Sequence, residues 1–133
     1  MEMRIPAAIL EARQAPATEV VPNGIEFSFS PQLSAHFDRD TRALWSRWTA
    51  DPRPCFNPSL LADIRAYYDF IAQTRGVVQL NGEEHPLEYV VLATGMPGVF
   101  NLGGDLDLFK QLIGSQDRAG LVRYGRACND VLY

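Results

Sequence analysis

The sequence predicts an α/β domain with a mixed sheet and flanking helices. Segments rich in β-branched and aromatic residues alternate along the chain with segments whose apolar residues recur at helical spacing. A strand, a helix and a second strand in succession require a β-α-β crossover. The 133 residues, 47% of them hydrophobic and 21% charged, allow one globular domain with a modest core.

The composition argues against several classes of function. The formal net charge is −4 and the arginines are scattered, which makes nucleic acid a poor partner. No apolar stretch approaches the roughly 20 residues that span a bilayer, so we expect no membrane partner and a cytoplasmic location. Cys55 and Cys128 lack the spacing of a zinc or redox pair, so we expect two buried thiols and no metal site.

The first third of the chain predicts a loose arm followed by strands. Residues 1–22 carry several prolines and few regular signals, so we expect an arm with one short strand at most, placed to contact a partner. Residues 25–31 alternate apolar and polar side chains, which is typical of a strand with one buried face. Residues 33–49 predict two strands joined by a polar turn at 38–40.

A helix is predicted between Asn57 and Gly76. Asn57 can cap the first turn, and Pro58 suits the first helical position because no backbone N–H is needed there. Gly76 is a natural end because glycine adopts the left-handed conformation that follows many helices. The predicted apolar stripe consists of Leu61, Ile64, Tyr68 and Ile71.

Residues 77–94 predict two strands around Asn81-Gly82, the dipeptide that most favours a tight hairpin turn. The second strand, 87–94, is a continuous apolar run of the kind that is buried on both faces of a sheet. It leads the chain toward the paired glycines that follow.

Residues 99–109, with the sequence VFNLGGDLDLF, place two glycines before a helix start. Asp105 is a good N-cap, and apolar residues at helical spacing predict a helix over 105–113. Free N–H groups at such a start can hold an anion, or an oxygen on which negative charge develops. We therefore expect the Gly104 N–H to be unpaired and to face a pocket. The simpler alternative is a tight turn at the glycines that Asp105 only caps.

The end of the chain predicts a last helix after an interruption at Gly114. One face of this helix carries Leu121, Tyr124, Cys128 and Leu132. Because no terminating glycine, proline or polar tail follows, we expect this helix to continue into a further part of the fold.

No other residue offers a convincing nucleophile or general base. His85 lies beside two glutamates, which could suggest a metal or acid–base site, but a solvated hairpin turn explains it. His36 has no acid or cysteine at ligand spacing and is assigned no role. Asp105 and Asp107 could act as a pair, but a helix cap and a charge that complements the helix dipole account for them.

Two segments resemble the crotonase, or enoyl-CoA hydratase/isomerase, superfamily. PLEYVVLATGMPGVFNLGGDLDLF resembles its first oxyanion-hole segment, where a strand enters a [FA]-x-x-G-[AG]-D-[LI] turn and a helix. ALWSRWTADPRPCFNPSLLADI resembles the family's first strand and RP-x-x-N loop, with Arg53, Pro54 and Asn57 in place. Within the superfamily the segments are most similar to diffusible signal factor synthases, which make cis-2-unsaturated fatty acid signals in bacterial quorum sensing.

The resemblance implies a crotonase-like β-β-α spiral fold, of which residues 23–133 form the N-terminal part. It implies that the Gly104 N–H is one of two donors to a thioester carbonyl oxygen, and that Asn57, Asn101, Leu102 and Gly103 line the substrate path. The implied substrates are 3-hydroxyacyl thioesters of coenzyme A or acyl carrier protein, and no separate cofactor is implied. Family members are usually trimers or paired trimers, so we expect a homo-trimer or hexamer.

The family's second donor and its catalytic glutamates lie beyond the segments matched here. Two hypotheses follow: the front half of a crotonase-type enzyme that dehydrates a 3-hydroxyacyl thioester and hydrolyses it, or a truncated, non-catalytic paralogue that binds acyl chains or partner subunits. The family's next parallel strand also lies outside these residues. We therefore expect the isolated polypeptide to be inactive and prone to associate, with an uncovered edge at 87–94.

Overall fold

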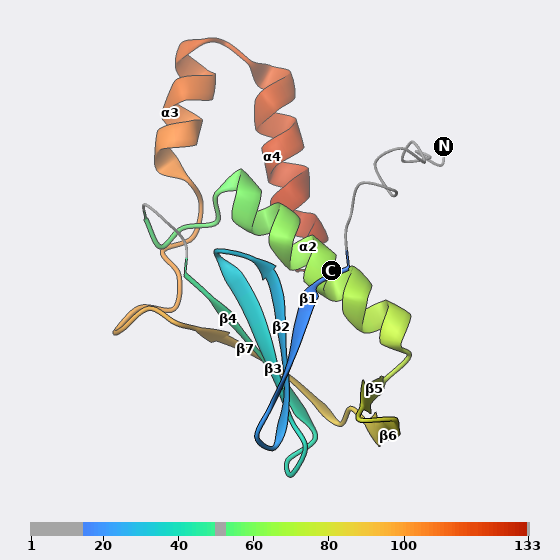
Figure 1. The fold of residues 1–133 in the computed structure, drawn as a ribbon. Helices are drawn as coiled ribbons and strands as arrows, with labels where there is room; N and C mark the ends of the chain where they lie inside the picture. Colours follow the sequence, from blue (N-terminus) through green and yellow to red (C-terminus); the bar gives the residue numbers. More distant parts are fainter. Residues whose placement is uncertain (1–14, 50–52, 133) are drawn as a thin grey trace.

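A computed structural model describes residues 15–49 and 53–132, and these form a mixed α/β fold (Figure 1). The main sheet has five strands in the order β1-β2-β3-β4-β7. Its first four strands are antiparallel, and β7 runs parallel to β4. The strands are β1 (Ala17–Val21), β2 (Gly24–Ser30), β3 (Leu33–Asp38), β4 (Ala43–Trp48) and β7 (Tyr89–Thr94). The predicted α/β class with a β-α-β crossover is confirmed.

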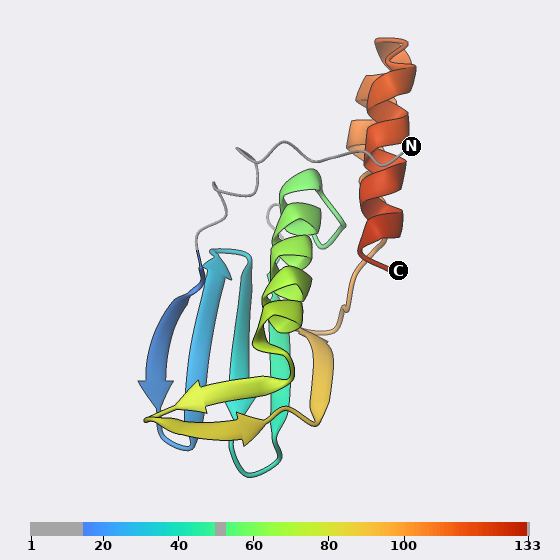
Figure 2. The same cartoon turned by 90° about the vertical axis from the view of Figure 1, so that its right-hand side faces the viewer.

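The core lies between the middle of this sheet and helix α2 (Pro58–Thr74), which crosses one face of it (Figures 1 and 2). The alternating pattern predicted for β2, β3 and β4 places every second side chain on that face. In register, Phe37 lies opposite Leu44 and Leu33 opposite Trp48. All four side chains are almost fully buried. The predicted hairpin of β3 and β4 is therefore confirmed.

Helix α2 begins and ends at the predicted signals. The Asn57 side chain accepts a hydrogen bond from the Leu60 N–H at 2.8 Å, and Pro58 occupies the first turn. Arg75, at a φ of 53°, ends the helix, and Gly76 continues the left-handed conformation at 78°. In the predicted stripe, Leu61 and Ile64 are buried and Tyr68 and Ile71 are half-buried against the core; Tyr67, which the prediction left out, is fully buried.

The segment 77–94 contains three strands rather than the predicted two. β5 (Val77–Leu80) and β6 (Glu83–Pro86) pair in a separate hairpin. Asn81 and Gly82 have φ values of 53° and 79°, so the predicted tight turn is confirmed. The chain then leaves this hairpin before β7 begins in the main sheet. His85 was wrongly expected in a solvated turn, because it lies half-buried on β6 with its ring 6.2 Å from that of Phe37.

Strand β7 is not buried on both faces, contrary to its apolar pattern. Tyr89, Val90 and Leu92 are 60%, 44% and 41% exposed. The physical reason is that β7 forms one edge of the sheet in the described residues, while α2 packs over the middle strands. The opposite edge is β1, the short strand expected in the arm; the rest of that arm, residues 1–14, lies outside the described residues.

The last two helices, α3 (Leu106–Gly114) and α4 (Arg118–Asp130), form a hairpin that projects beyond one end of the sheet (Figure 1). Asp105 caps α3 as predicted, although the helix runs through Gly114 rather than ending before it. Leu106 and Ile113, predicted on the apolar face, are 75% and 64% exposed. Helix α4 ends at Asp130 with Val131 as its C-cap, so the expected continuation is not seen.

Two leucines in helices provide a test of this core. Leu60 is fully buried and Leu106 is 75% exposed. Replacing Leu60 by Ala should lower the free energy of unfolding by about 2–5 kcal/mol, because the cavity lies in a packed interior. Replacing Leu106 by Ala should change it by less than about 0.5 kcal/mol. Urea denaturation followed by circular dichroism measures both, and equal losses would contradict the assigned core.

Candidate functional site

The candidate site lies where the chain leaves two parallel strands. Because β4 and β7 are parallel, the described residues of the loops that follow them, 53–57 and 95–105, meet at one end of the sheet. Open α/β sheets bind ligands at this position, outside the carboxyl ends of their strands. The loops pair directly: the Leu102 N–H donates to the Pro54 carbonyl at 2.6 Å, and the Phe56 N–H donates to the Gly103 carbonyl at 2.8 Å.

The hydroxyl of Tyr124, from α4, closes this pairing. It donates to the Phe56 carbonyl at 2.6 Å and accepts from the Asp105 N–H at 2.9 Å. Its ring packs edge to face on Phe109, with centroids 5.2 Å apart. The residue is only 5% exposed, and this burial raises the pKa of Tyr124 to about 12. The hydroxyl therefore stays protonated at neutral pH and can donate and accept at the same time.

Two further contacts hold the glycine loop in place. The buried Trp48 indole N–H donates to the Phe100 carbonyl at 3.0 Å, and the two rings lie 4.8 Å apart. The Asn101 side chain accepts from the Gly103 N–H at 2.7 Å. The Asn101 Nδ2 atom is buried and has no hydrogen-bond partner among the described residues. Gly103 has a φ of 93°, a conformation that L side chains rarely adopt, so this position requires glycine.

The Gly104 N–H is left without an acceptor in the described part of the chain. Gly104 makes a single parallel bridge with Phe56. The Gly103 carbonyl and the Asp105 N–H are directed at the Phe56 loop and Tyr124. Because the Gly104 N–H and the Gly103 carbonyl belong to one trans peptide group and point in opposite directions, the Gly104 N–H points away from the Phe56 loop. It lies in an exposed part of the loop.

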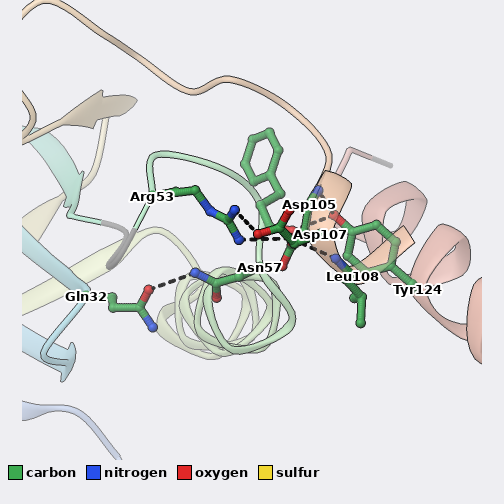
Figure 3. A network of polar contacts seen from close by, with 8 residues as sticks. Gln32, Arg53, Asn57, Asp105, Asp107, Leu108 and Tyr124 are labelled. Atoms are coloured by element: carbon green, nitrogen blue, oxygen red, sulfur yellow. Dashed lines mark hydrogen bonds and ion pairs between the residues drawn. The ribbon is translucent and has the colours of Figure 1, made fainter. Parts of the chain in front are cut away.

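Arg53, Asp105 and Asp107 form a cluster of charged side chains beside this loop (Figure 3). Arg53 forms an ion pair with Asp107, and its Nη2 atom lies 3.6 Å from Asp105 Oδ1. The hydrogen bond to Asp107 is the main cause that raises the pKa of Arg53. Asp105 also caps α3 by accepting from the Leu108 N–H at 3.1 Å. One cation and two carboxylates leave a net negative charge, which disfavours a bound anion and also opposes negative charge that develops on an oxygen during reaction, so stabilisation of such an oxygen must come from the N–H donor itself.

The structure brings four predicted site residues together and places a fifth nearby. Asn101, Leu102, Gly103 and Gly104 share one loop, and Asn57 ends the loop that pairs with it. The Asn57 amide is already engaged, because its oxygen caps α2 and its nitrogen donates to Gln32 at 3.2 Å (Figure 3). Sequence reasoning missed Tyr124 as a site residue. Its position on a helix face indicated burial, and nothing local indicated where its hydroxyl would bond.

A cavity of about 460 Å³ lies beside the site, between α2, α3 and α4. Its walls are mainly apolar and include Leu61, Leu108, Leu112, Tyr124 and Val131. Gly104 does not line it, so the pocket expected in front of the Gly104 N–H is not this cavity. Tyr124 is the residue common to the cavity wall and the loop pairing.

The described residues contain no cluster of three or more histidine, cysteine or acidic side chains that could hold a metal ion. Both cysteines are unpaired; Cys55 is buried and Cys128 half-buried. Burial raises the pKa of the Cys55 thiol, which makes it a poor nucleophile. None of the described helices has the length and apolar character needed to cross a membrane.

Comparison with protein-family models gives no match to this sequence, and a search of curated proteins gives none either.

The two buried tyrosines predict how stability depends on alkaline pH. Burial raises the pKa of Tyr67 and of Tyr124 to about 12, above the usual 10. Their stabilising contribution is therefore complete below pH 10 and is lost as the pH rises toward 12. Urea unfolding at increasing pH should show this fall, and Tyr124→Phe should reduce it by roughly half. Identical pH profiles for both proteins would contradict the assignment of Tyr124.

Proposed function

We propose that this chain supplies the first oxyanion-binding segment of a crotonase-type site for acyl thioesters. The observation that supports this most directly is the unpaired Gly104 N–H, whose neighbours at Leu102, Gly103 and Asp105 all have acceptors. The reaction is the loss of water from a 3-hydroxyacyl thioester, of coenzyme A or acyl carrier protein, followed by hydrolysis of the thioester. The product is a 2-enoic acid of the kind used as a fatty-acid quorum-sensing signal.

The chemistry explains why a backbone donor is suitable. Removal of the α-proton, or attack of water on the thioester, places negative charge on the carbonyl oxygen. A preorganised donor at that oxygen contributes about 3–4 kcal/mol to the transition state. A backbone N–H cannot titrate, and the loop pairing holds it before the substrate arrives. The net negative charge around Arg53, Asp105 and Asp107 also favours a neutral carbonyl over a phosphate or carboxylate.

Complete catalysis needs groups that these residues do not offer. Asp105 and Asp107, the carboxylates next to Gly104, are engaged by the helix cap and by Arg53. A second donor and a catalytic carboxylate would come from further polypeptide, within a crotonase-like spiral fold that assembles as a trimer or hexamer in the cytoplasm. No cofactor beyond the carrier thioester is required.

A second candidate function is binding without catalysis, as a non-catalytic paralogue that holds an acyl chain or a partner subunit. This function is favoured because Asp105 already caps α3 and Asp107 is paired with Arg53, so neither carboxylate is free to act in catalysis. The two functions share the Gly104 contact and differ in turnover. Adding 3-hydroxydecanoyl-CoA to the ¹⁵N-labelled chain should shift the Gly104 amide resonance under either function. Free thiol and enoyl absorbance, followed with a complete enzyme that carries this segment, then separate them, because the isolated chain should be inactive under either function. An unmoved Gly104 resonance would refute both.

Substitutions at Gly104 test the donor itself. Gly104→Pro deletes the N–H and should abolish the thioester-induced shift; in any complete enzyme carrying this segment it should lower turnover about 10²- to 10³-fold. Gly104→Ala is the matched control because it keeps the N–H, although its Cβ would lie 2.9 Å from the Phe109 ring edge, which must move slightly. Equal activity of the proline variant and wild type would defeat the assignment of Gly104.

A further inference from the structure

The hydroxyl of Tyr124 bonds to both loops at the point where they pair. Phe56 and Gly104 form a single parallel bridge, in which the Phe56 N–H donates to the Gly103 carbonyl at 2.8 Å. Beside this bridge, the Tyr124 oxygen lies 2.9 Å from the Asp105 nitrogen and 2.6 Å from the Phe56 oxygen. One hydroxyl therefore holds both loops at the residue that follows Gly104.

This arrangement leaves one donor available in the segment 102–105. The Leu102 N–H donates to Pro54, the Gly103 N–H to Asn101, and the Asp105 N–H to Tyr124. Tyr124 thus holds the Asp105 N–H on the side of the Phe56 loop. The preceding peptide group, which carries the Gly103 carbonyl and the Gly104 N–H, then directs the Gly104 N–H to the opposite side. We propose that Tyr124 is a positioning residue that holds the Gly104 N–H toward an incoming carbonyl oxygen, an inference that rests on the proposed function.

Packing around the tyrosine supports this role. A Cβ built on Gly104 would lie 3.9 Å from the Tyr124 oxygen and 2.9 Å from the edge of the Phe109 ring. Phe109 and Tyr124 also pack against each other edge to face. The two rings therefore pack against one side of Gly104. The Tyr124 hydroxyl provides the hydrogen bonds that connect α4 to the glycine loop and to the Phe56 loop. The side chain touches the loop and does not need to touch substrate.

Removing the hydroxyl while keeping the ring tests the proposal. In Tyr124→Phe, hydrogen exchange of the Asp105 amide should accelerate at least about tenfold, because its acceptor is lost. Titration with 3-hydroxydecanoyl-CoA, followed at the Gly104 amide, should show affinity reduced by about tenfold. Tyr68→Phe is the matched control, since Tyr68 is a half-buried tyrosine on α2 whose ring packs near Tyr67 and which has no hydrogen bond or ring contact with the glycine loop in the described residues. It should change neither quantity.

A second variant covers the case in which Tyr124→Phe does not fold. 3-Fluorotyrosine at position 124 keeps the size of the ring and the donor but weakens the oxygen as an acceptor. It should leave the thermal midpoint unchanged while accelerating Asp105 exchange and weakening thioester binding together, which a purely structural role would not do. Binding equal to wild type in the folded variants would overturn the role of Tyr124 alone. Absence of any Gly104 shift in the wild-type protein would overturn the proposed function as well.

Discussion

The Tyr124 hydroxyl joins segments that are far apart in sequence, and the geometry of the candidate site depends on it. It connects α4 to the Phe56 loop after β4 and to the Asp105 segment after β7. Such a bond adds only about 0.5–1.5 kcal/mol of net stability, but leaving a buried polar partner unsatisfied costs about 1–3 kcal/mol. These hydrogen bonds therefore constrain the geometry more than they stabilise the fold. Once α4 packs on α2, both loops must lie within hydrogen-bonding distance of the Tyr124 hydroxyl.

The same constraint explains why glycine occurs twice at this point. Gly103 is needed for its φ of 93°, which turns its carbonyl toward Phe56. At Gly104 space is limited, because a Cβ would lie 2.9 Å from the edge of the Phe109 ring and that ring would have to move slightly. The alternative in which the glycines make only a tight turn accounts for the first requirement. It does not account for an amide that remains unpaired while its neighbours on both sides are paired.

Local signals predicted the parts of the fold that depend on a few adjacent residues. Helix α2 begins at Asn57-Pro58 and helix α3 at Asp105, and the β5–β6 hairpin turns at Asn81-Gly82, all as predicted. Caps and tight turns could be predicted because each depends on only a few adjacent residues. Contacts between distant segments could not be predicted in this way. The hydroxyl bonds of Tyr124 span 68 and 19 residues, and the exposure of β7 depends on what lies beside it rather than on its own apolar sequence.

The uncovered strand and the incomplete site lie at the same place. Val90 and Leu92 are in register with Leu44 and Ser46, so they share the face on which α2 packs, yet both stay substantially exposed. A strand added beside β7, whatever its source, would remove the open edge, and an element packed on the extended sheet would bury this face. If the strand ran parallel, its carboxyl end would arrive at the end of the sheet that carries the Gly104 loop. Under the proposed function, further groups for the site could then arrive with the element that covers this face, so stability and activity should appear together.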